Sequence, residues 1–119
     1  SRLAPPDQAE FLRDLGLPDR ALDRVLHVAY ELLGLISFLT VGEDECRAWS
    51  IPAGTPAVRA AGAIHSDLEK GFIRAELCAF DELVAAGSWA ACRDRGTLRL
   101  EGKEYVMQDG DVVEWRFNV

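Results

Sequence analysis

The first part of the chain alternates apolar and polar side chains with the period of an α-helix. Residues 7–15 place their apolar side chains on one helical face, and Gly16 follows as a stop signal. Over residues 18–33 the apolar positions recur at alternating steps of three and one, which is the spacing of a single helical stripe. The stripe consists of Leu22, Val25, Leu26, Ala29, Tyr30 and Leu33. The pattern predicts two helices, and the second lies against a core and ends at Gly34.

After this helical part the pattern changes to that of β-strands. Residues 35–41 and 46–51 are rich in β-branched and aromatic side chains, and the polar segment 42–45 separates them. Two such runs around a polar turn predict a β-hairpin. A short helix is expected next, with Thr55 as its cap and Pro56 at its first position.

The middle of the chain combines a polar turn, a strand and two short helices. Residues 65–71 are polar and end in glycine, so we expect a loop or a short helical turn in which Ser66 or Asp67 caps backbone groups. Residues 72–80 have alternating polar positions, which is typical of a strand with one solvated face. Two helices that end at glycines follow, at 81–86 and 89–95.

The C-terminal part has the pattern of strands alone. Residues 98–100 and 105–107 flank Glu101–Gly102, which predicts a second hairpin. Asp109–Gly110 is a turn before a last strand at 112–117. The order of elements predicts an α+β domain with one mixed sheet and helices gathered on one face. A hairpin that grips a helix, with later strands beside it, is the β-grasp (ubiquitin-like) pattern.

Composition bounds the function further. The chain has 119 residues, room for one domain with or without an appendage. It carries 13 basic and 20 acidic residues, a net charge of −7, which argues against charge-driven coating of nucleic acid but leaves room for a local basic patch. It has no apolar run of about eighteen residues, so we expect no membrane span. It begins at Ser1 without an initiator Met, so we expect a piece of a longer protein.

Catalytic and metal-binding patterns are missing. Three cysteines without a C-x-x-C pair indicate reduced thiols, two or three of them buried, in the cytosol. The lone Gly-Lys, at Gly102–Lys103, has Thr97 and Glu104 where a P-loop needs Gly and Ser or Thr. His65, Ser66 and Asp67 are adjacent, which argues against a catalytic triad, because such groups converge from different parts of a fold. We therefore predict no catalytic, cofactor-binding or metal-binding residue in this chain.

Several motifs nevertheless resemble one family. The most specific run is HSDLEKGFIRAE at residues 65–76, and LEGKEY at 100–105, QDGDVV at 108–113 and the terminal FNV add to it. Together they resemble the C-terminal end of the Obg-like ATPases, the YchF family of translation-associated P-loop proteins. The resemblance extends over about residues 8–119.

The resemblance implies a division of the chain and a role. Residues 35–119 would form a TGS domain of β-grasp fold, and residues 1–34 would be the last helices of the nucleotide-binding domain. The family's ATP or GTP site and its Mg²⁺ lie upstream, so none of its catalytic residues transfers to this chain. What transfers is a non-catalytic, cytoplasmic module that binds RNA or the ribosome, or regulates the parent. The alternative is a structural domain that docks on the ATPase domain without touching nucleic acid.

The candidate contact residues are the basic positions of the matching motifs. They are Arg47, Lys70, Arg74 and Lys103. Each could instead be paired with one of the many acidic residues around it. The apolar stripe on helix 18–33 adds self-association as a further expectation, because an uncovered apolar face favours contact between copies.

Overall fold

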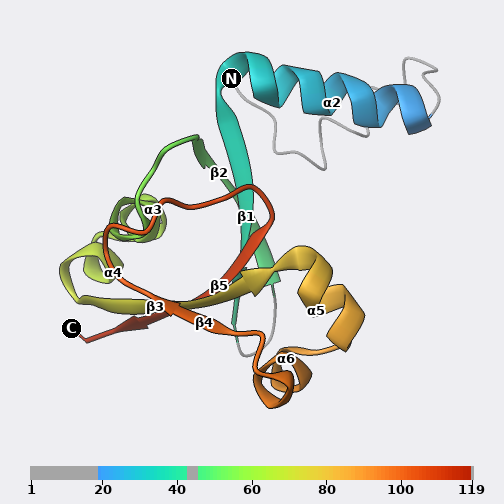
Figure 1. The fold of residues 1–119 in the computed structure, drawn as a ribbon. Coiled ribbons are helices and arrows are strands. Elements are labelled where there is room, and N and C mark those ends of the chain that lie inside the picture. Colours follow the sequence, from blue (N-terminus) through green and yellow to red (C-terminus); the bar gives the residue numbers. More distant parts are fainter. Residues whose placement is uncertain (1–18, 43–45, 119) are drawn as a thin grey trace. The chain divides into compact units, whose positions relative to one another are not determined.

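The computed structural model describes residues 19–42 and 46–118 (Figure 1). The chain divides into two compact units, 1–34 and 35–119, and each is described by itself. In the first, helix α2 spans Asp19–Leu33 and confirms the helix expected at 18–33. The helix expected at 7–15 lies outside the described residues. The identity of 1–34 as the end of a nucleotide-binding domain stays a prediction.

Five strands form one mixed sheet in the second unit, in the order β2-β1-β5-β3-β4. β1 and β2 form the expected antiparallel hairpin, β5 lies parallel to β1, and β3 is antiparallel to both β5 and β4. The strands are β1 Leu35–Val41, β2 Cys46–Pro52, β3 Phe72–Ala79, β4 Arg99–Glu101 and β5 Asp111–Phe117. A first hairpin beside a parallel C-terminal strand, with a helix across the sheet, confirms the α+β class and the β-grasp pattern.

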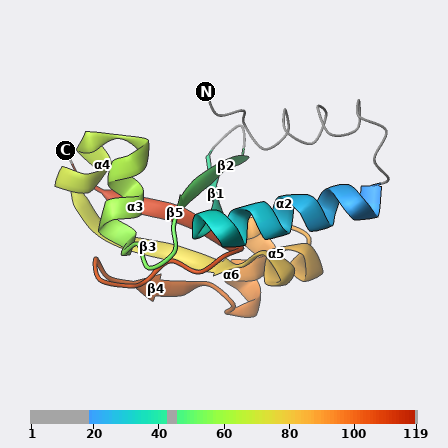
Figure 2. The same cartoon turned by 90° about the horizontal axis from the view of Figure 1, so that it is seen from above.

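Two pairs of helices cover opposite faces of this sheet. α3 (Ala57–Ile64) and α4 (Ser66–Lys70) precede β3, whereas α5 (Phe80–Ala86) and α6 (Trp89–Arg95) follow it. Figures 1 and 2 show the two pairs at opposite ends of β3. The alanines of α3 pack in one cluster with Leu77, whereas Leu83 and Trp89 pack in another with Cys78. Leu77 and Cys78 are neighbours on β3 and therefore point to opposite faces of the sheet. The prediction that all helices gather on one face is wrong.

The main core lies between α3 and the sheet. Phe38, Leu77, Met107 and Val113 are almost fully buried there. Phe38 meets the edge of Trp115 at 6.0 Å between ring centroids and an interplanar angle of 78°, a geometry that aromatic pairs favour. This rigid layer fixes which side chains of β3 and β5 remain on the other face.

Two local predictions are wrong. Thr55 does not cap α3, because its hydroxyl donates to the Pro52 carbonyl at 2.6 Å instead. Residues 105–107 do not pair with β4 in a hairpin. Val106 forms an isolated bridge with Pro56, and the backbone N–H of Met107 donates to the Thr55 carbonyl. This route buries the Met107 side chain in the core, a contact that a tight hairpin with β4 would forfeit.

Candidate nucleic-acid interface

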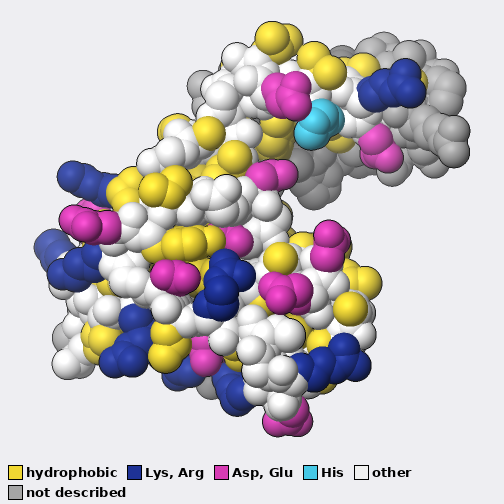
Figure 3. Space-filling model, viewed as in Figure 1, with side chains coloured by type: hydrophobic (Ala, Val, Ile, Leu, Met, Phe, Trp, Pro, Cys, Tyr) yellow, Lys and Arg dark blue, Asp and Glu magenta, His cyan; other side chains and the backbone are white. Residues whose placement is uncertain are grey.

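The four basic residues proposed from the sequence are all exposed but do not form one patch. Arg47 lies on β2 opposite Thr40, on the α3 side of the sheet, and Lys70 ends α4 on that side. The carbonyl of Lys103 accepts a hydrogen bond from Val58 at the start of α3. Arg74 lies on β3 and points to the opposite face, because its neighbour Ala75 is buried against α3. Figure 3 shows basic side chains scattered among acidic ones on the visible face.

Arg74 instead belongs to a group of charged side chains that we call the Glu76 cluster: Arg74, Glu76, Arg93, Glu114 and Arg116. In the register of β3 and β5, Arg74 stands opposite Arg116 and Glu76 stands opposite Glu114. The Glu76 Oε1 accepts from the Arg116 Nη2 at 2.8 Å and from the Arg93 Nη2 at 3.4 Å. Glu114 lies 3.4 Å from the same Arg116 nitrogen.

The acidic and basic side chains of this cluster differ in how much of each is exposed to solvent. The side chain of Glu76 is only 13% exposed, whereas those of Arg93 and Arg116 are 53% and 47% exposed. The carboxylate therefore lies beneath the guanidinium groups. Arg74 is exposed and makes no ion pair within residues 19–42 and 46–118. Like charges directly opposite each other on a sheet are unfavourable, so Glu76 compensates the repulsion between the arginines.

Sequence reasoning found Arg74 but missed Arg93 and Arg116. The alternation of Arg74 and Glu76 had indicated a solvated strand face, and β5 carries the same alternation at Glu114 and Arg116. The alternation on β5 was the sequence signal that could have identified Arg116. The cluster itself forms only because β3 pairs with β5 in this register and α6 packs beside β3.

A second polar group is structural. The carboxylate of Asp111 is buried and accepts from the Tyr105 hydroxyl at 2.8 Å and from the backbone N–H of Gln108 at 2.9 Å. Arg99 Nη2 donates to the Tyr105 oxygen at 3.2 Å. Burial, together with the hydrogen bond to Asp111, raises the pKa of Tyr105 to about 12. This network ties the segment after β4 to the start of β5.

The run at residues 65–71 is a structural turn. His65 caps α4, because its Nδ1 accepts from the backbone N–H of Asp67 at 3.0 Å, so the expected cap by Ser66 or Asp67 is wrong. A Cβ on Gly71 would collide with the carbonyl of Asn118, whose N–H donates back to the Gly71 carbonyl at 2.8 Å. His65 and Gly71 therefore serve the local fold, and neither places a reactive group in a cleft.

The cysteines do not suggest a nucleophile. Cys78 and Cys92 are fully buried, Cys46 is exposed, and all three are free thiols. Burial, with Cys92 as a close neighbour, raises the pKa of Cys78 to about 12. A thiol with that pKa stays protonated at neutral pH, and the thiol form is a poor nucleophile.

The described residues do not fit a nucleotide or metal site. Gly102–Lys103 follows the short strand β4 and leads to no helix, and the first N–H groups of α3 beside it donate to the carbonyls of Tyr105 and Lys103 rather than to a phosphate. Among the residues that the structure describes, no group of three or more His, Cys, Asp or Glu side chains could hold a metal ion. The same part of the chain contains no helix long and apolar enough to span a membrane.

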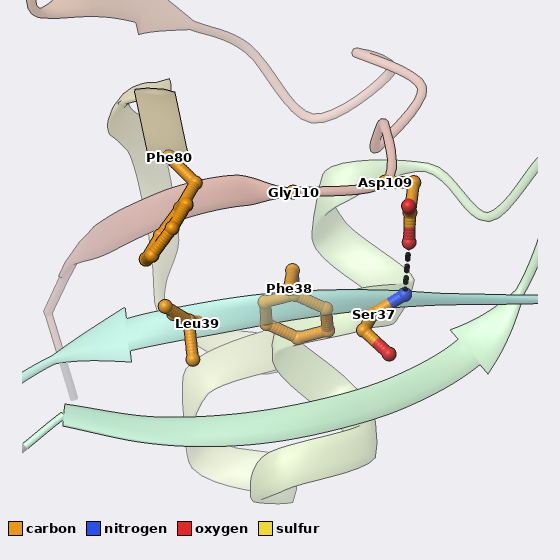
Figure 4. A pocket seen from close by; sticks show the side chains of 6 residues that line it. All are labelled: Ser37, Phe38, Leu39, Phe80, Asp109 and Gly110. Atoms are coloured by element: carbon orange, nitrogen blue, oxygen red, sulfur yellow. Dashed lines mark hydrogen bonds between the residues drawn. The ribbon is translucent and has the colours of Figure 1, made fainter. Parts of the chain in front are cut away.

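One small apolar pocket lies where β3 ends and β5 begins, at the opposite end of these two strands from the Arg74–Arg116 pair. It has a volume of about 200 Å³, and Figure 4 shows Phe80 at the start of α5 turned toward Leu39 of β1. Asp109 closes one side, where its Oδ1 accepts from the backbone N–H of Ser37 at 2.8 Å. The remaining lining comes from Phe38 and Gly110. Phe80 and Val84, one helical turn apart, are 46% and 62% exposed beside it.

Comparison with known proteins agrees with the resemblance seen in the sequence. The chain is 48% identical, over all 119 residues, to the "Ribosome-binding ATPase YchF" of Bacillus subtilis and covers 32% of that protein. It is 45% identical to "Obg-like ATPase 1" of Caenorhabditis elegans over 115 residues, 96% of this chain and 29% of the relative. The chain thus spans about a third of the length of these relatives.

A solved structure and a family model give the same assignment. The structure of the Schizosaccharomyces pombe YchF GTPase superposes with a TM-score of 0.74 at 37% identity, over 96% of this chain and 30% of that one. The model of the YchF-GTPase_C family, described as a protein of unknown function (DUF933), matches residues 35–118. This chain therefore belongs to the YchF-GTPase_C family.

Proposed function

We propose that this chain is a non-catalytic, ribosome- or RNA-binding module of a longer cytoplasmic YchF-type ATPase. The single observation that carries the proposal is the 48% identity, over the whole chain, to a relative whose printed name is a ribosome-binding ATPase. The chain covers only a third of that relative, so the activity in the name belongs to the parent protein. A role in contact with the ribosome suits a domain with exposed cations such as Arg74, which makes no ion pair with any residue that the structure describes.

The described residues support a binding role rather than a chemical one. They contain no P-loop and no cluster of metal ligands, and the buried thiol of Cys78 stays protonated. Catalysis of ATP or GTP hydrolysis would then rest on a nucleotide-binding domain elsewhere in the parent. The prediction is that the isolated chain hydrolyses neither nucleotide.

Co-sedimentation with ribosomes tests this function. The wild-type chain is expected to pellet with ribosomes at low salt and to be released as salt rises, because contacts between arginine or lysine and phosphate exchange with bound counterions. Nucleotide turnover is measured in the same preparation. Absence of sedimentation at every salt concentration, or clear turnover by the chain alone, would contradict the proposal.

Docking on the parent's ATPase domain is a second candidate, and the apolar pocket at Leu39 and Phe80 favours it. Phe80 of the pocket and Val84, one turn further along α5, are both exposed apolar side chains that a domain of the same protein could cover. Titration of the ATPase domain into the chain tests it. Tight binding that is weakened by Phe80→Ser, together with no affinity for ribosomes, would favour docking over the first proposal.

A further inference from the structure

We propose that the Glu76 cluster is the surface that contacts the ribosome, and that it binds the phosphodiester backbone of ribosomal RNA. The inference rests on the proposed function and specifies its site and its ligand. It replaces a scattered set of basic residues by three arginines on one side of the sheet: Arg74 on β3, Arg116 on β5 and Arg93 on α6.

The cluster offers an anion the charges and donors that it needs. Each guanidinium carries five N–H donors, and Glu76 uses one from Arg93 and one from Arg116 at the distances given above. Arg74 adds a guanidinium without an ion pair in the described part of the chain. Because Arg74 and Arg116 are direct cross-strand neighbours, their Cβ atoms lie about 5 Å apart. A single phosphate can accept hydrogen bonds from both side chains.

The arginine side chains of the cluster are more exposed than the glutamates, so its outer surface is positive. Three arginines and two glutamates leave a local excess of one positive charge, and Glu76 is 13% exposed beneath guanidinium groups that are about half exposed. Glu114, at 34%, is also less exposed than Arg116. An approaching ligand therefore meets cations first. The carboxylate below holds two of the three arginines in place, which lowers the entropy lost when they bind.

The chemistry favours RNA over an acidic protein surface. All three cations are arginines, whose planar fork matches the oxygens of a phosphate or a carboxylate in two parallel hydrogen bonds, so the preference for RNA rests on how the arginines are arranged. They form a row on one side of the sheet that begins at the Arg74–Arg116 pair and continues past Glu76 to Arg93 on α6, and a backbone with one charge per nucleotide can follow such a row. The rest of the chain has a large acidic excess, with a total net charge of −7, so it repels a polyanion elsewhere and confines the contact to this face.

The test compares variants of the full 119-residue chain. Arg74→Gln, Arg116→Gln and the double variant remove the cross-strand pair. Arg59→Gln is the matched control, because Arg59 is an exposed arginine of α3, on the opposite side of the sheet, and lies 3.6 Å from Glu69. Binding to intact ribosomes and to protein-free ribosomal RNA is measured over a series of salt concentrations. Circular dichroism and thermal unfolding verify that each variant is folded.

We expect each substitution in the pair to weaken binding to both ligands roughly tenfold, as for a charged hydrogen bond worth about 1.5 kcal/mol. The slope of log affinity against log salt should fall by about 1 for each arginine removed, and Arg59→Gln should change neither quantity. Ribosome binding that equals wild type in the double variant overturns the inference while the proposed function stands. Loss of ribosome binding with unchanged RNA binding overturns the RNA assignment, since the contact is then with a ribosomal protein. A wild-type chain that binds neither ligand refutes the proposed function and the inference together.

Discussion

Arg74 of β3 stands directly opposite Arg116 of β5, and the Arg116 guanidinium lies 2.8 Å from the carboxylate of Glu76, two residues along from Arg74. The sheet thus holds two like charges side by side and compensates them with a third residue that is nearly covered. A domain selected for stability alone would place an opposite charge or an apolar residue at one of these positions. The arrangement is understandable if the exposed guanidinium groups serve a partner.

Glu76→Gln is expected to lower the free energy of unfolding by about 1 kcal/mol. The substitution keeps the shape of the side chain but removes the carboxylate that Arg93 and Arg116 share and the negative charge that lies on the same strand face as Arg74. The loss should shrink in high salt, where the repulsion between the arginines is screened. Denaturant titration at two salt concentrations measures it. Glu104→Gln, an exposed residue without an ion pair in the described part, is the control, and equal effects of the two substitutions would contradict the role of Glu76.

Gly71→Ala is expected to destabilise the fold by about 1–3 kcal/mol, the range for overpacking in a tight site. The backbone of Gly71 is compatible with alanine, at φ −95°, so the cost comes only from the collision of the new Cβ with the Asn118 carbonyl. Gly102→Ala is the matched control, since no atom lies within 4 Å of its added Cβ. Unfolding of the Gly71→Ala variant at the same denaturant concentration as wild type would refute this packing.

Tyr105→Phe is expected to cost about 1–3 kcal/mol at neutral pH, because the buried Asp111 carboxylate loses a hydrogen-bond donor. The pH dependence gives a sharper readout. The pKa of Tyr105 is raised from about 10 to about 12, so its contribution is complete below pH 10 and is lost as the pH rises from 10 to 12. Cys78 also titrates there, and it is common to both chains. The stability difference between wild type and Tyr105→Phe should therefore narrow above pH 10, and a constant difference up to pH 12 would count against the network.

His65→Ala is expected to lower stability by about 0.5–2 kcal/mol, the usual cost of losing a helix cap. The Nδ1 of His65 is the acceptor for the backbone N–H of Asp67, and alanine supplies none. His65→Asn, which brings a side-chain oxygen that can serve the same N–H, should recover most of the loss. Thermal unfolding of the three chains measures it, and an asparagine variant as weak as the alanine variant would show that the cap is unimportant.

Local sequence signals predicted the elements that local physics determines. β1 follows the apolar run at 35–41, and α6 begins after the Ser88 hydroxyl, which accepts from the Ala91 N–H at 3.0 Å. Local sequence patterns gave the wrong prediction where a segment distant in the sequence hydrogen-bonds to the same backbone groups. Residues 105–107 had the pattern of a hairpin strand, but Met107 pairs with the Thr55 carbonyl and enters the core.

The sequence by itself determined the family, the α+β class and the absence of a P-loop motif, because these reside in residue identity and short-range spacing. The tertiary structure decided which other residues join Arg74 in the candidate site. Arg74, Arg93 and Arg116 are separated by up to 42 positions. Only the register of β3 with β5 and the packing of α6 bring Arg93 and Arg116 to the Glu76 carboxylate and place Arg74 opposite Arg116. Pairing between distant strands depends on the whole buried core, so no local pattern encodes it.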